Sequence, residues 1–274
     1  MVTGKDPRRL PEDFTHLLLT RFNTAVDYAP SPRRLESEWL LPRLALFERY
    51  CLPSVKAQRG AVFNWLVFCD ASSPGWFKDI IAHYAPLVKA IYITGPANDK
   101  VIAQEVKSSG FVCSPHLITT RLDNDDAISE DHLSLIQKAF LHQNREFVMF
   151  PFGLQLYHGA LYHVYWRSNP FLSLIERVGE NSELTTVYCV RHDKVAQQEK
   201  VRYVSRSAQW LQVLHTANLG NALRGWPKLR PASHPAFDVR WEEDIAHDPL
   251  PRRIAASAGS YIGRLRRVSE RIFA

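Results

Sequence analysis

Three aspartates, Asp123, Asp125 and Asp126, lie within four positions of the segment TRLDNDDAI. Carboxylates this close repel one another and raise each other's pKa unless a positive group lies between them. Mg²⁺ or Mn²⁺ fits such a pair, because it binds one or two carboxylates and takes substrate phosphates as further ligands. The pattern favours a metal–phosphate site over its alternative, an acidic loop that caps the next helix, which is a role that suits Asp126.

The elements around the aspartates predict an α/β fold, a mixed sheet flanked by helices. Short runs rich in β-branched and aromatic residues predict strands over Thr15–Asn23, Asn64–Ser72 and Val88–Gly95, and a fourth from His116 up to the aspartates. In open α/β sheets, ligands bind beyond the carboxyl ends of the strands. The aspartates should therefore lie at the binding edge of the sheet.

The rest of the chain alternates helical and extended patterns. Residues 37–58 predict two or three short helices, broken at Pro42 and Pro53, and Ser129 can cap a helix that follows the aspartates. Residues 146–166 predict a hairpin that turns at His158 and Gly159. Residues 185–193 predict a further strand, and 207–225 carry an apolar stripe at helical spacing.

Composition limits the class of protein. The 274 residues are 46% hydrophobic, enough to bury a substantial core, and the formal charge of +6 favours anionic partners. The four cysteines form no CxxC pair and predict buried thiols in a reducing compartment, without a disulfide or a zinc site. Neither a signal-peptide core nor a membrane-spanning run is recognisable, so we expect a cytoplasmic protein.

Several segments together resemble a known family. TRLDNDDAI resembles the Asp-x-Asp segment of GT-A glycosyltransferases, and the series HLLLTRFN, LFERYCLPSVKAQ, FNWLVFCD, LITTRLDNDDAI and WLQVLHTANLGNALRG resembles a family of bacterial rhamnosyltransferases. The resemblance implies a GT-A domain over residues 1–233 and a basic extension over 234–274. It also implies a nucleotide-sugar donor (dTDP-rhamnose), Mn²⁺ or Mg²⁺, and a glycan or lipid-linked acceptor in surface polysaccharide synthesis.

The resemblance suggests roles for individual residues in binding the metal and the donor. Asp125 is the expected direct metal ligand, and Asp123 should touch the metal, its waters or the donor ribose. Arg121 can pair with a phosphate or with a neighbouring acid. Two further donor-binding residues are expected, Arg21 at the end of the first strand and Asp70 near the nucleobase, although Asp70 could equally form a turn.

A histidine from the C-terminal half is expected to complete the metal site. His215 lies off the apolar stripe of the helix predicted over 207–225, and His192 ends the predicted strand before it. We favour His215. An inverting transfer, which the resemblance implies, also needs a carboxylate base, and Glu176 is preferred over Glu180 and Glu183 because it closes an apolar stretch.

The tail from Pro251 to Ala274 predicts an amphipathic helix. Its apolar face is flanked by six arginines and comprises Ile254, Ala258, Tyr261, Leu265, Val268 and Ile272. This face could pack on the catalytic domain or bind an anionic membrane surface.

Two other functions account for parts of the sequence. The basic charge and five tryptophans are compatible with nucleic-acid binding, but the arginines do not interleave with aromatics, so no nucleic-acid partner is expected. A metal-dependent phosphoesterase would share the aspartates, but the sequence lacks a two-metal set of several histidines.

Overall fold

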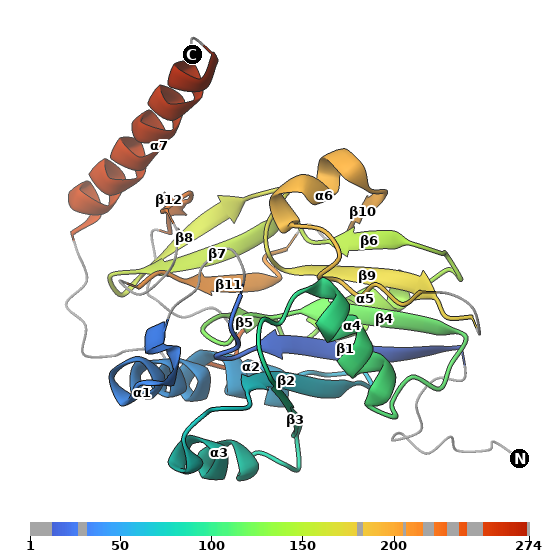
Figure 1. Cartoon of the computed structure of the whole chain (residues 1–274). Helices are drawn as coiled ribbons and strands as arrows, with labels where there is room; N and C mark the ends of the chain where they lie inside the picture. Colours follow the sequence, from blue (N-terminus) through green and yellow to red (C-terminus); the bar gives the residue numbers. More distant parts are fainter. Residues whose placement is uncertain are drawn as a thin grey trace, which may run out of the picture.

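A computed structural model describes residues 13–26, 32–179, 183–204, 207–215, 222–228, 236–239 and 249–272, with the side chains of the last segment described to residue 263. Two sheets with helices around them make up the described chain (Figure 1). The predicted α/β class, a mixed sheet flanked by helices, is confirmed.

The main sheet has the strand order β10-β6-β9-β4-β1-β2-β3. Six of these strands run in the same direction, and β9 runs against its neighbours β4 and β6. The four predicted strands are all present, with bounds within two residues of the predicted ones at most ends. The strands are β1 (Phe14–Arg21), β2 (Asn64–Asp70), β3 (Val88–Ile93), β4 (His116–Arg121), β6 (Glu146–Met149), β9 (Leu172–Arg177) and β10 (Val201–Tyr203).

Helices cover both faces of this sheet, because alternate residues of each central strand enter different cores. Leu18 and Val67 pack with α1 (Ser37–Leu46), the π-helical turn η2 (Phe47–Cys51), α2 (Leu52–Lys56), α3 (Gly75–Ala82) and α5 (His132–Lys138). Leu17 and Leu66 pack with α4 (Asp99–Ser108) and α6 (His192–Gln198). A short 3₁₀ helix, η1 (Pro32–Leu35), precedes α1.

Residues 37–58 contain three short helical elements, α1, η2 and α2, as predicted, and these follow one another without a gap. Two local predictions are wrong, namely the break at Pro42 and the cap at Ser129. Pro42 lies inside α1, whose buried Leu40 and Leu44 hold it to the core, and Pro53 lies in the first turn of α2, where its missing N–H is not needed. Ser129 does not cap α5, whose N-cap is Asp131 without a side-chain bond, because the Ser129 hydroxyl bonds to side chains instead.

The second sheet has the order β12-β8-β7-β11-β5. Its strands are β5 (Ala127–Ile128), β7 (Phe152–Tyr157), β8 (Ala160–Tyr165), β11 (Trp210–Val213) and β12 (Trp226–Pro227). The predicted hairpin is confirmed as β7 and β8. His158 and Gly159 connect them with φ angles of 46° and 67°, a positive pair that suits a two-residue hairpin turn.

Two segments adopt a different structure from the one predicted. Residues 207–215 contain strand β11 in place of a helix, because Trp210 is buried between the sheets and Leu211 joins a separate core with β7 residues. Residues 185–191 form turns in place of a strand, and His192 begins α6. Apolar residues in both segments are buried, but tertiary contacts set their backbone conformation.

The four cysteines are free thiols, but not all are buried as predicted. Cys51 and Cys69 lie in the core beside the main sheet, whereas Cys113 is exposed and Cys189 is half-buried. Cys113 and Cys189 occupy loops and not helix or strand interiors.

The predicted tail helix is present as α7 (Leu250–Ile272), which extends beyond β12 and β8 in Figure 1. Two of its serines face the protein: Ser257 is buried, and Ser260 donates a hydrogen bond to the Leu223 carbonyl. Ile254 and Tyr261 of the predicted apolar face are 45% and 50% exposed. The side chains of Leu265, Val268 and Ile272 lie outside the described part.

Candidate active site at the carboxyl ends of the parallel strands

Asp125 lies just beyond β4 and is almost fully buried. Its Oδ2 atom accepts a hydrogen bond from Arg43 Nη1 at 2.6 Å and lies 2.9 Å from His215 Nε2. Arg43 comes from α1, and His215 follows β11 by two residues. Three distant parts of the chain therefore meet at one carboxylate oxygen.

The position of His215 depends on how β11 is anchored. Trp210 of β11 stacks on Phe171 with ring centroids 4.9 Å apart, and its Nε1 donates to the Phe150 carbonyl. Gly153 of β7 makes room for this indole, since a Cβ atom there would lie 2.0 Å from the ring. Strand β11 is thereby fixed beside the aspartate segment, and it carries His215 with it.

Asp126 ties the two segments together. Its Oδ1 accepts a hydrogen bond from the Val213 backbone N–H at 2.9 Å, two residues before His215. Burial, reinforced by the charges of Asp125 and Asp123, raises the pKa of Asp126 well above its ordinary value. Asp126 therefore has a structural role: it connects the aspartate segment to β11. The sequence had suggested a helix cap instead.

Asp123 belongs to a second cluster with Arg121. The Arg121 guanidinium binds it bidentately, with Nε and Nη2 at 3.1 and 2.7 Å from the two carboxylate oxygens. Burial alone would raise the pKa of Asp123, but Arg121, aided by Arg21 and His192, holds it below its ordinary value. Both oxygens of Asp123 therefore face a guanidinium.

Tyr188 organises the basic residues of this second cluster. The guanidinium carbons of Arg21 and Arg121 lie 4.6 and 5.8 Å from the centre of its ring, and its hydroxyl donates to the Leu19 carbonyl. Burial and the nearby Arg121 lower the pKa of His192 to about 4, so this histidine is neutral at pH 7. His192 lies on the Asp123 side, and His215 lies on the Asp125 side.

Asp70 ends β2 farther along the same edge. One of its oxygens accepts from Arg34 Nη2 at 2.8 Å, and the other accepts from the Ser72 N–H at 2.8 Å. Asn23, just beyond β1, accepts from the Asp70 N–H and donates to Ser73. The turn-forming role that the sequence allowed for Asp70 is present, together with an ion pair.

The structure separates Glu176 from the aspartates, so the prediction of Glu176 as the base is corrected. Glu176 pairs in register with Leu117 at the start of β4, which is six residues, or roughly 20 Å of extended chain, before Asp123. Its carboxylate accepts from the backbone N–H groups of Thr185 and Thr186 and from the Thr185 hydroxyl. These bonds indicate a structural acid that fixes the following loop.

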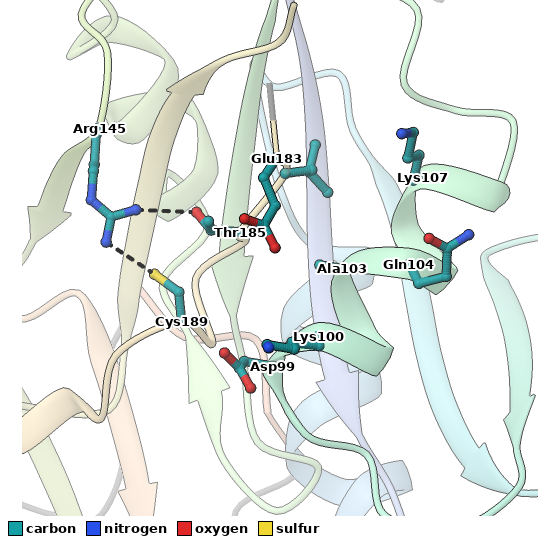
Figure 2. Close-up of a pocket in the computed structure, with 10 residues that line it drawn as sticks. Asp99, Lys100, Ala103, Gln104, Lys107, Arg145, Glu183, Thr185 and Cys189 are labelled. Carbon is teal, nitrogen blue, oxygen red and sulfur yellow. Dashed lines mark hydrogen bonds between the residues drawn. The ribbon is translucent and has the colours of Figure 1, made fainter. Parts of the chain in front are cut away.

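Glu183, an alternative base, lines a cavity of about 490 Å³ between α4 and the loop after β9, shown in Figure 2. Arg145 spans one wall of the cavity and hydrogen-bonds to Thr185 and Cys189 (Figure 2). None of the three aspartates lines it. Glu180, the remaining alternative, lies outside the described residues.

The donor atoms at Asp125 fit part of a metal site. Adjacent ligands of an octahedral Mg²⁺ with bonds near 2.1 Å lie about 3 Å apart, and Asp125 Oδ2 and His215 Nε2 are separated by 2.9 Å. Within the described ranges no group of three histidine, cysteine or acidic residues is placed to hold an ion, and Asp123 is turned toward Arg121. Asp125 and His215 are therefore the described side chains here that could hold an ion, and Arg43 Nη1 lies 2.6 Å from the same carboxylate oxygen.

Sequence reasoning missed Arg43, Arg34 and Tyr188. Arg43 follows Pro42 in a helix otherwise recognised by its apolar positions, and nothing in that pattern distinguishes it from a surface arginine. Arg34 lies in a short 3₁₀ turn, and Tyr188 lies in a segment that was predicted to be a strand. Each acquires its role only through residues far away in the chain.

Comparison with known proteins defines the class. One family model, described as "Putative rhamnosyl transferase", matches residues 31–225, which is most of the chain. That description names a class of glycosyltransferases. The chain belongs to this rhamnosyl transferase family, which confirms the resemblance in the sequence.

Solved structures also resemble the chain. TarS 1–349 from S. aureus in complex with UDP is 12% identical with a TM-score of 0.45, over 74% of this chain and 60% of that one. The UDP-GlcNAc complex of the same protein is 13% identical with the same TM-score and coverage. A 4-diphosphocytidyl-2C-methyl-D-erythritol synthase is 12% identical with a TM-score of 0.40, over 72% of this chain and 91% of that one. No curated protein matches the chain.

Proposed function

We propose that the protein is a metal-dependent glycosyltransferase that moves rhamnose from a nucleotide-rhamnose donor, dTDP-rhamnose, to a glycan or lipid-linked acceptor, with inversion at the anomeric carbon. Family membership supports the transfer reaction and the sugar. The single observation that supports this site is the meeting of Asp125, His215 and Arg43 at the carboxyl end of β4. The proposed product belongs to surface polysaccharide synthesis.

The edge of the sheet offers separate places for the parts of the donor. Asp70 and Asn23, beyond β2 and β1, provide polar groups for a nucleoside. Arg21 and Arg121 lie beside Asp123, where guanidinium groups can bind phosphate oxygens bidentately. Asp125 and His215 would hold Mn²⁺ or Mg²⁺, which when bound supplies positive charge to the diphosphate.

These residues must stabilise the negative charge that develops on the leaving diphosphate. When the bond from the anomeric carbon to the diphosphate breaks, its electron pair stays on the leaving oxygen. Preorganised guanidinium groups at a water-poor edge stabilise this charge better than the same groups in solution, because they need no reorientation. Arg121 is preorganised by Asp123 and by the Tyr188 ring.

The donor proposal is tested by calorimetry with dTDP-rhamnose, UDP-glucose and UDP-GlcNAc, each with and without Mn²⁺. We expect dTDP-rhamnose to bind most tightly and only weakly without the metal. Equal binding with and without Mn²⁺ would remove the metal from the proposal, and preference for a UDP-sugar would change the donor. Proton NMR of the product then reports whether the anomeric configuration is inverted.

We also propose that α7 attaches the protein to an anionic membrane surface, where a lipid-linked acceptor would be found. No helix in the described part of the chain is long and apolar enough to cross a bilayer. The outer side of α7 exposes Ile254, Tyr261 and Ile262, of which Ile262 is 64% exposed, while Ser257 and Ser260 pack inward. Six arginines and one glutamate in the tail favour anionic lipid, at about 1 kcal/mol for each basic residue near the surface.

Exchange of the exposed apolar side chains tests this attachment. We expect Ile254→Ser/Ile262→Ser to lose binding to liposomes that contain phosphatidylglycerol, whereas the exposed-site control Ala255→Ser retains it. Higher salt should weaken binding of the wild type, because the arginines are screened. Transfer to a soluble acceptor should be unchanged in both variants. Liposome binding by the double variant at the level of the wild type would contradict the proposal.

A further inference from the structure

Arg43 makes contacts that a structural ion pair does not explain by itself. Its Nη1 lies 2.6 Å from Asp125 Oδ2, the same oxygen that lies 2.9 Å from His215. The side chain is 12% exposed, and its guanidinium lies 5.1 Å from the centre of the Trp39 ring. A cation therefore already occupies the oxygen best placed to ligate a metal ion.

A metal ion held by Asp125 and His215 would compete with the Arg43 guanidinium for this oxygen. Two cations on one carboxylate oxygen repel each other strongly at a buried position, since little water screens them. A nucleoside diphosphate changes this balance, because its phosphates bring negative charge that both cations can share. With metal and donor bound, the Arg43 guanidinium would leave Asp125 and bind the diphosphate instead.

The position of Arg43 allows this exchange. It projects from α1, which is held to the core through Leu40 and Leu44, so the backbone stays in place while the long side chain moves. The Trp39 face supports a guanidinium in more than one position, because the cation–π attraction is broad. An arginine also binds phosphate bidentately, as it binds carboxylate.

We propose that Arg43 is a catalytic residue of the transfer, a role that rests on the proposed function of this site. It neutralises Asp125 before the donor binds and then binds the leaving diphosphate. In the reaction the bond from the anomeric carbon to the diphosphate oxygen breaks, and its electron pair remains on that oxygen, which Arg43 stabilises. The acceptor hydroxyl oxygen forms the new bond to the anomeric carbon, and its proton passes to a base or to water.

The test compares Arg43→Gln and Arg43→Lys with Arg33→Gln, an exposed arginine before α1 that pairs with Glu36. Mn²⁺ binding to the protein alone is measured by electron paramagnetic resonance. We expect Arg43→Gln to bind Mn²⁺ about tenfold more tightly, because the competing cation is gone. Affinity for dTDP in the presence of Mn²⁺ should fall about tenfold, and single-turnover transfer about 100-fold. Arg33→Gln should match the wild type.

If Arg43→Gln does not fold, Arg43→Lys provides the test. It keeps a positive charge beside the buried Asp125 carboxylate, so this carboxylate is not left unpaired. It should retain wild-type Mn²⁺ affinity but transfer at least about tenfold more slowly, because the ammonium lacks the planar fork. Mn²⁺ and dTDP affinities of Arg43→Gln equal to those of the wild type would overturn the proposal, as would full transfer by Arg43→Lys.

Failure of the metal proposal is distinguishable from failure of this one. If the wild type binds no Mn²⁺ with or without dTDP, the metal is removed from the proposed function. Arg43 then remains testable through dTDP alone. Weaker dTDP binding by Arg43→Gln under those conditions supports the inference, and unchanged binding overturns it.

Discussion

Asp125 and Glu176 are both buried carboxylates beside β4, 5% and 6% exposed, but they lie near opposite ends of that strand. Glu176 is held by backbone N–H groups of a loop, which cannot leave without unfolding the loop. Asp125 is held by the side chains of Arg43 and His215, not by backbone groups. Burial and hydrogen bonding are therefore alike at the two acids, and the kind of partner distinguishes them.

The position in the sheet gives the same distinction. Asp125 lies at the carboxyl ends of the parallel strands, the end at which open α/β sheets bind ligands. Glu176 lies at the other end, where its bonds connect β9 to residues 185 and 186. Substitutions at the two acids should separate binding from stability.

The largest expected effect is that of Asp125→Asn on nucleotide binding. The amide is a poor metal ligand, so we expect affinity for dTDP in the presence of Mn²⁺ to fall about 100-fold. Calorimetry measures this loss, and circular dichroism checks that the fold is retained. A variant with wild-type affinity and metal dependence would place the metal elsewhere.

Glu176→Gln should have the opposite pattern. The amide NH₂ of glutamine would face the donors Thr185 N–H and Thr186 N–H, so charge-assisted hydrogen bonds are lost and two donors meet. We expect the unfolding free energy to fall by about 3 kcal/mol. Donor affinity and turnover should stay within about twofold of the wild type under conditions where the protein is folded. Urea unfolding and a transfer assay provide the two measurements. Lost turnover in a stable variant would restore Glu176 as a candidate base.

Asp126→Asn should have the smallest effect, and it should be stabilising. Folding raises the pKa of Asp126, so the folded protein favours the protonated carboxyl. The resulting gain in unfolding free energy is fully present below the unfolded pKa, near 3.9, and is lost as the pH rises toward the folded pKa. An asparagine oxygen can still accept from Val213 without this loss. We expect a gain of about 1 kcal/mol at pH 8 and less at pH 5, measured by urea unfolding. Equal gains at both values would contradict the shifted pKa.

Much of the main sheet was predictable from local patterns. The strands predicted from Thr15, Asn64, Val88 and His116 are short runs rich in β-branched, aromatic and other apolar residues. All but the edge strand β3 are buried almost throughout, as expected inside a sheet that is covered on both faces. Asp125 was recognised because closely spaced carboxylates after such a strand are unusual. The hairpin was recognised from the His158–Gly159 turn.

The incorrect predictions share one cause. The segment around Trp210 has apolar residues at spacings that suit a helix, yet it pairs with β7 and β5 because those strands offer open edges. Residues 185–191 have strand-forming residues, but bonds to Glu176 and Thr119 shape them into turns. Local propensity is outweighed where long-range partners satisfy the backbone better.

The sequence by itself determined that the protein has an α/β sheet with Asp123 and Asp125 at the end of a buried strand, because strand patterns and charge spacing are local properties. Only the tertiary structure decided that Arg43 and His215 meet at one oxygen of Asp125. Arg43 is 82 positions from Asp125 and His215 is 90 positions from it. The two reach one oxygen through the packing of α1 and the pairing of β11, and contacts over such separations depend on how whole elements assemble.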